Sequence, residues 1–105
     1  MKEKDAYIAR RIREEIESID PKAQVILFGS RARGDAKKDS DWDVLILIDS
    51  QVTTYIERAF RYQLFDLELE TGEVFSTFIH NIKDWNMRHK VTPFYRSIKK
   101  EGVRL

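Results

Sequence analysis

VILFGSRARGDAKKDSDWDVLILID, residues Val25–Asp49, is the stretch of this sequence that decides the fold. It holds a short apolar run ending at Gly29, a polar segment, and a second apolar run headed by two aspartates. Continuous apolar runs of this length are typical of strands that are buried on both faces. We therefore expect strands at Gln24–Phe28 and Asp41–Asp49. A short helical turn is expected between them, with Ser30 as its N-cap.

Helical periodicity dominates the sequence on both sides of this stretch. Apolar residues recur every three or four positions, and proline or glycine follows where each pattern stops. The predicted elements are helices over about Lys2–Ser18, Thr53–Glu70 and Thr92–Lys100, a strand over Glu73–His80, and a loop with a short turn over Asn81–Lys90. Strands that alternate with helices predict an α/β (α+β) fold in which helices flank a small mixed β-sheet.

The composition is that of a small globular protein. The 105 residues are 42% hydrophobic and 35% charged, which favours one folded domain over residues 1–105. With 19 basic and 18 acidic residues, the net charge of +1 gives no argument for binding nucleic acid or membranes. There is no cysteine, no signal peptide, and no apolar run of the roughly 20 residues that span a bilayer. We expect a soluble, cytoplasmic protein.

The Gly-Ser pair after the first predicted strand has the properties of a phosphate site. Gly29 has no Cβ, so a phosphate can approach its backbone closely. Ser30 adds a hydroxyl, and a helix that begins there would direct its amides at an anion. Arg31 and Arg33 follow and can supply positive charge. Each feature is common in ordinary turns, so the prediction depends on what lies beside it.

Two carboxylates head the second predicted strand. Because a strand alternates its faces, Asp41 and Asp43 project to the same side, whereas Trp42 points to the other side and packs under a helix. Two adjacent carboxylates suit Mg²⁺, which commonly uses one or two of them together with substrate phosphates. Alone, the pair would be read as a solvated strand start. Beside a Gly-Ser turn, it indicates a nucleotide site.

This combination resembles the polymerase-β-like nucleotidyltransferase superfamily, whose hallmark is Gly-Ser, a spacer, and then Asp-x-Asp. Here it reads Gly29-Ser30, ten residues, and Asp41-Trp42-Asp43. The string GSRARGDAKKDSDWD is similar to the minimal, stand-alone branch. The resemblance implies that Gly29 and Ser30 hold nucleotide phosphate and that Asp41 and Asp43 are catalytic ligands of Mg²⁺. Arg31 and Arg33 match frequent residues of the family and are predicted to bind nucleotide.

The resemblance also implies an activity and a partner. Such domains transfer a nucleoside monophosphate from a nucleoside triphosphate, here expected to be ATP, to a hydroxyl. Members of the stand-alone branch are often antitoxins paired with a helical HEPN-type toxin, which makes a partner protein the expected acceptor. Active members carry a third carboxylate on the next strand. Here Ser76 matches that position best, and Glu73 at the start of the strand is the alternative.

Two functional hypotheses therefore stay open. The chain is an active nucleotidyltransferase, or it is a weak or inactive binding module of the same fold that regulates its partner by contact. A nucleic-acid-binding role is disfavoured by the near-neutral charge and the lack of an aromatic-basic motif. His80 and His89 have no evident metal-ligand partners and are expected to be structural. Phe60, Phe65, Phe75 and Phe78 are expected in the core. Trp85 is expected in the core or on a surface that binds a partner.

Overall fold

The computed structural model describes residues 1–105 as five helices around a four-stranded sheet. In chain order the elements are α1 (Glu3–Glu17), β1 (Gln24–Phe28), α2 (Ser30–Arg33), β2 (Trp42–Ile48), α3 (Thr54–Thr71), β3 (Phe75–Asn81), α4 (Ile82–Arg88), α5 (Pro93–Glu101) and β4 (Val103–Arg104). The predicted α/β fold, a small mixed sheet flanked by helices, is confirmed. No helix is both long and apolar enough to cross a membrane.

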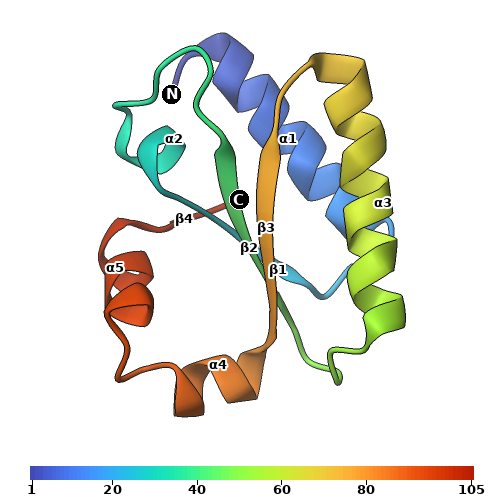
Figure 1. The fold of residues 1–105 in the computed structure, drawn as a ribbon, viewed down its shortest axis with the longest axis vertical. Coiled ribbons are helices and arrows are strands. Elements are labelled where there is room, and N and C mark those ends of the chain that lie inside the picture. Colours follow the sequence, from blue (N-terminus) through green and yellow to red (C-terminus); the bar gives the residue numbers. More distant parts are fainter.

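The sheet has the strand order β3-β2-β1-β4. β1 runs antiparallel to β2 and to β4, whereas β2 and β3 are parallel. Parallel neighbours need a crossover connection, and α3 supplies it between β2 and β3. In Figure 1, α1 and α3 cover one face of the sheet, and α4 and α5 lie on the other. The end of β1 and the start of β2 meet near α2.

The face of the sheet under α1 and α3 holds the main core. It is a cluster of 14 buried apolar residues drawn from α1, α3 and the first three strands. β2 contributes every second residue to this cluster, starting with Trp42, whose side chain has no exposed surface. The predicted position of Trp42 is confirmed. Because strand faces alternate, the residues on either side of Trp42 must face away from this core.

The opposite face of the sheet is only partly covered. A second, smaller cluster joins Leu45 and Leu47 of β2 to Trp85 of α4 and Ile98 of α5. Toward the start of β2 the cover thins, and the rings of Phe28, Phe78 and Phe94 meet there with centroids 5.4–5.6 Å apart. Beyond these rings no helix covers the face, which leaves the start of β2 accessible.

The ends of the helices agree with the sequence pattern, with two corrections. Gly72 ends α3, as the glycine after the predicted helix indicated, and it does so in the left-handed region. Thr92 is the N-cap of α5, which begins at Pro93. Thr53, at which the helix was predicted to begin, is instead the N-cap of α3, and its hydroxyl accepts from the backbone of Ile56. The N-cap of α2 is Gly29 rather than Ser30, because the helix begins one residue earlier than expected.

Other expectations differ from the structure where contacts distant in sequence decide the outcome. The segment predicted as a loop after β3 forms α4, which Asn81 caps by accepting from the backbone of Asp84. A short strand, β4, adds to the far edge of the sheet beside β1. Phe60 and Trp85 are buried. Phe65 is exposed on the outside of α3, and Phe78 is partly exposed because only Phe28 and Phe94 cover its ring.

Candidate functional site

Gly29 and Asp43 lie against each other at the open end of the sheet. The antiparallel register pairs Phe28 with Asp43, so the chain turns at Gly29 directly beside the aspartate. A Cβ added to Gly29 would overlap the Asp43 carboxylate, and the φ of 73° is one that residues with a side chain rarely adopt. Only glycine fits this position. The close contact between the turn and the Asp43 carboxylate therefore depends on the absence of a side chain at position 29.

Asp41 and Asp43 share the open side of the sheet. Partial burial, together with the nearby negative charge of Asp41, raises the pKa of Asp43, whereas the positive charge of Arg33 opposes that rise. A partly buried carboxylate that is held close to a second one is stabilised by a cation. The predicted proximity of the two aspartates to the Gly-Ser turn is therefore present in the structure.

Ser76 completes the row of side chains across this end of the sheet. It is the β3 residue paired with Asp43, and its hydroxyl donates a hydrogen bond of 3.1 Å to Oδ2 of Asp41. This is the position at which the resemblance calls for a third carboxylate. A hydroxyl can orient Asp41, but it is a poor proton acceptor near neutral pH, because it is not ionised.

Glu73, the alternative third carboxylate, lies on the other side of the sheet. Its carboxylate accepts a hydrogen bond of 3.3 Å from Nε1 of Trp42 and lies 3.6 Å from the Arg31 guanidinium. Only 13% of its side chain is exposed. Because Trp42 points away from Asp41 and Asp43, Glu73 is held away from them as well. Ser76 is therefore the residue that stands in the third position.

Arg31 is turned away from the two aspartates. Its guanidinium lies 5.0 Å from the Trp42 ring and donates a hydrogen bond of 2.9 Å to the backbone oxygen of Ser40. It also lies 3.7 Å from the Asp5 carboxylate, and only 8% of its side chain is exposed. These contacts attach the polar connection before β2 to the core. They give Arg31 a structural part, and its predicted binding of nucleotide stays a prediction.

Arg33 lies on the same side as the aspartates. Its guanidinium is 3.3 Å from Asp35 and 3.3 Å from Glu101, and its side chain is partly exposed. Its charge is close enough to oppose the raised pKa of Asp43. Arg33 is therefore the arginine of the pair that remains available to a negatively charged ligand near the carboxylates.

The side chains at this end of the sheet fit one divalent cation shared with a ligand. Asp41 and Asp43 supply two carboxylates, and no group of three or more acidic or histidine side chains is placed to hold a metal ion. A site of two carboxylates agrees with the chemistry of Mg²⁺, which retains water and takes further oxygen ligands from phosphates. The protein groups thus suit a cation that arrives with a phosphorylated ligand.

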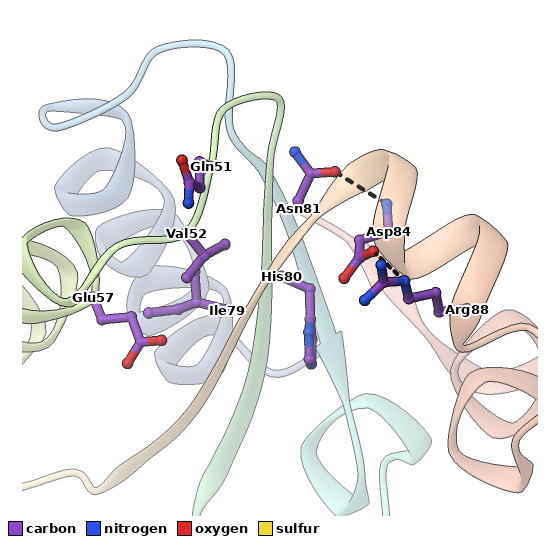
Figure 2. Close-up of a pocket in the computed structure, with 8 residues that line it drawn as sticks. All are labelled: Gln51, Val52, Glu57, Ile79, His80, Asn81, Asp84 and Arg88. Carbon is purple, nitrogen blue, oxygen red and sulfur yellow. Dashed lines mark hydrogen bonds and ion pairs between the residues drawn. The ribbon is translucent and has the colours of Figure 1, made fainter.

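A wide cavity lies at the other end of β3, away from the aspartates. It has a volume of about 730 Å³ and is lined by residues on both sides of the strand, among them His80, Asp84 and Arg88 (Figure 2). Several of its polar groups already bind each other: Arg88 is 3.0 Å from Asp84, and Asn81 caps α4. Its size would favour this cavity as the site. The candidate site is placed at the opposite end of the sheet because two carboxylates face the Gly-Ser turn there.

The two histidines, which the sequence places nine residues apart, come together beside this cavity. Their ring centroids are 4.6 Å apart, and both rings stack on Trp85. Burial is the main reason that the pKa of His80 is lowered, and repulsion by His89 adds to it. The sequence gives no sign of this cluster, because the turn from β3 into α4 creates it.

Comparison with known proteins identifies the family and similar folds. A family model described as a nucleotidyltransferase domain matches residues 9–103. A crystal structure of a toxin-antitoxin with AMP-PNP has a TM-score of 0.65 at 18% identity, over 90% of this chain and 69% of that one, and so shares the fold. A structure of the Cid1 poly(U) polymerase with MgGTP bound has a TM-score of 0.47 at 31% identity, over 63% of this chain and 22% of that one. A search among curated proteins found no match.

Proposed function

The chain belongs to the nucleotidyltransferase domain family, and from that premise we propose that it binds a nucleoside triphosphate with Mg²⁺ and transfers the nucleoside monophosphate to a hydroxyl. The acceptor in this proposal is a side chain of a partner protein, specifically a HEPN-type toxin, in the cytoplasm. Asp41 and Asp43 hold the metal and take part in catalysis. Gly29, Ser30 and Arg33 bind the phosphates.

One observation carries this proposal. The Asp43 carboxylate lies directly against Gly29, with Asp41 beside it on the same open side of the sheet. A triphosphate on the Gly-Ser turn would therefore meet the two carboxylates at once. Bound there, Mg²⁺ would neutralise phosphate charge and help to orient the groups that react. The chain's own part is to hold the α-phosphate in line with an incoming oxygen.

The proposed reaction uses only a few groups of the protein. The acceptor oxygen forms a bond to the α-phosphorus, the bond between that phosphorus and the bridging oxygen to the β-phosphate breaks, and pyrophosphate leaves. The acceptor's proton passes to water or to one of the two carboxylates, because Ser76 is not a base. The aspartates and the Gly-Ser turn fix the geometry. The sheet face beyond Ser76 is the side from which an acceptor can approach.

ATP is the nucleotide to test first. The toxin-antitoxin structure of the same fold contains AMP-PNP, which is an analogue of ATP. That complex is also why a toxin is the first partner to test. Nothing in the composition of this chain favours a nucleic-acid acceptor, since its net charge is only +1.

A second candidate function is favoured by the hydroxyl at position 76. With Ser76 in the third position and Glu73 held on the far side of the sheet, the chain lacks the carboxylate that would activate the acceptor. The domain would then bind nucleotide and neutralise its partner by contact, with slow transfer or none. Removing a general base commonly lowers a rate by about 10²–10⁴-fold, which sets the scale of the difference.

Transfer of label from ATP separates the two candidates. The purified partner is incubated with Mg²⁺, ATP labelled on the α-phosphate, and the wild-type chain, Asp43→Asn or Ser76→Asp. An enzyme gives labelled partner that disappears with Asp43→Asn. If the hydroxyl at position 76 limits the rate, Ser76→Asp raises the labelling by about 10²-fold or more. Absence of label with all three chains, while the complex with the partner forms equally well, would reject transfer and leave the binding module.

A further inference from the structure

α3 exposes a stripe of large apolar side chains that do not pack on the sheet. Tyr55, Tyr62, Phe65 and Leu69 expose 82, 68, 53 and 70% of their surface. They follow one another at spacings of seven, three and four residues, which places them in one line along the helix. Scattered apolar residues on a surface are ordinary, whereas a continuous apolar patch marks a site of contact.

The outer edge of β3 adjoins this stripe. β3 is the last strand of the sheet, and its sequence, FSTFIHN, contains no proline and no acidic, lysine or arginine residue. Arg61 donates a hydrogen bond of 2.7 Å to the Thr77 hydroxyl, and Glu68 accepts one of 2.8 Å from the backbone of Phe75, so α3 and this edge are held side by side (Figure 1). Edge strands without charge or proline invite pairing with another strand.

A groove runs between the two elements and makes the surface continuous. Its volume is about 410 Å³, and it is lined by residues of α3 and β3 that include Tyr62, Phe65 and Phe75. We call the stripe, the groove and the outer edge of β3 together the α3–β3 face. The stripe and the groove lie on the side of the sheet that α3 covers, opposite the Asp41 and Asp43 carboxylates.

The charges beside the stripe indicate what kind of helix fits it. The N-terminal half of α3 exposes Arg58 and Arg61, whereas the C-terminal half carries Asp66 and Glu68. Two copies of α3 in antiparallel orientation bring the basic half of each against the acidic half of the other. In a pair centred between Leu64 and Phe65, Arg61 of each copy faces Glu68 of its partner. Parallel copies would instead place like charges together.

The area is sufficient for a two-fold contact. A buried aromatic side chain contributes roughly 150–250 Å², so the stripe offers roughly 500 Å² per copy and roughly 1,000 Å² for two, close to the lower limit of specific interfaces. The β3 edge adds to this. A two-fold axis lets the same face serve both copies. We propose that the α3–β3 face binds a second copy of this chain, with the α3 helices antiparallel and the β3 edges meeting beside them.

The oligomeric state tests this proposal directly. Sedimentation and light scattering over a wide range of protein concentration should show a dimer. Phe65→Glu should convert it to a monomer without unfolding it, since the side chain is on the surface. Met87→Glu, which changes an equally exposed residue on α4, is the matched control and should remain dimeric. Hydrogen exchange should slow in α3 and β3 as the dimer forms, and should not change in α4.

A charge exchange tests the orientation. Arg61→Glu and Glu68→Arg each turn two attractive contacts into repulsive ones, so each variant alone should dimerise roughly tenfold more weakly. Mixed in equal amounts, the two variants should form a heterodimer of near wild-type affinity, because every contact is again between opposite charges. A wild-type chain that stays monomeric alone, including one that binds only a different protein, overturns the proposal. So does a dimer that survives Phe65→Glu, or a mixture that gains nothing.

Discussion

Alternate residues of β2 point to the two faces of the sheet. One face contributes to the main core, and the other carries the carboxylates of the candidate site. Trp42 and the even-numbered residues after it are buried under α1 and α3, where they join the main core. Asp41 and Asp43, one position to either side, face the open part of the sheet beside Gly29. A shift of one residue would exchange the two sets. The strand therefore fixes the carboxylates by burying their neighbour, and substitutions on its two faces should have separable effects.

Trp42→Ala should have the largest effect, and the effect should be on stability. The substitution empties a fully buried site and removes the contacts of the indole with Arg31 and Glu73. Truncation of a buried aromatic costs about 3–5 kcal/mol of unfolding free energy. Urea denaturation followed by fluorescence of the remaining Trp85 would measure it. Met87→Ala, at an exposed position of α4, is the control and should change little. A similar loss in both variants would contradict the burial of Trp42 in the core.

Asp43→Asn should separate binding from stability on the other face of the same strand. Because burial and the charge of Asp41 raise the pKa of Asp43, its negative charge is unfavourable in the empty site. The amide should therefore leave the melting temperature unchanged or raise it. Affinity for ATP with Mg²⁺ should fall about 100-fold, since a metal ligand contributes several kcal/mol of charge stabilisation. Isothermal calorimetry is the measurement.

Asp39→Asn is the control for that experiment. Asp39 is an exposed aspartate in the connection before β2, so its substitution removes the same charge from the chain without touching the paired carboxylates. It should retain wild-type affinity. An equal loss in both variants would mean that general charge, rather than the position of Asp43, governs nucleotide binding.

Gly29→Ala should lower stability and binding together. The backbone of Gly29 has φ 73° and ψ −159°, a region essentially reserved for glycine, and the new methyl group would push the Asp43 carboxylate aside. Strain of this kind costs about 1–3 kcal/mol. Gly72→Ala is the matched control: it also has a positive φ, but its Cβ would meet open space. It should lose some stability and keep its nucleotide affinity, as measured by denaturation and calorimetry.

The sequence predicted the elements whose patterns are local. The apolar runs that become β1 and β2, and the alternation that sends Asp41 and Asp43 to one side, follow from the spacing of a strand. The partial cover of the sheet by helices cannot be predicted from such local spacing. It depends on where α4 and α5 pack, and α4 itself was missed because its seven residues carry only a short apolar pattern.

Side-chain direction was the least predictable part of the site. Arg31 and Arg33 are two residues apart in the same short helix, yet one reaches back to Trp42 and the other stays near the aspartates. Their roles differ because α2 turns them to different sides of the chain. Phe65 was expected in the core because apolar residues of a helix are usually buried. The structure shows that Phe60, Leu64 and Leu67 are the residues of α3 that pack on the sheet. Phe65 therefore belongs to a second, exposed apolar face of the helix.

The smallest predicted effect concerns the far end of the sheet. Burial, and repulsion by His89, lower the pKa of His80, whereas Asp84 and Glu57 act in the opposite direction. The unfolded chain therefore binds a proton at His80 more readily than the folded one, so stability should fall as the pH drops below the ordinary histidine pKa of about 6.5. His80→Gln removes this titration but leaves that of the carboxylates. Urea denaturation between about pH 7 and pH 5 should thus show a shallower decline for the variant. Equal slopes would mean that the His80 ring is as accessible to protons in the folded chain as in the unfolded one.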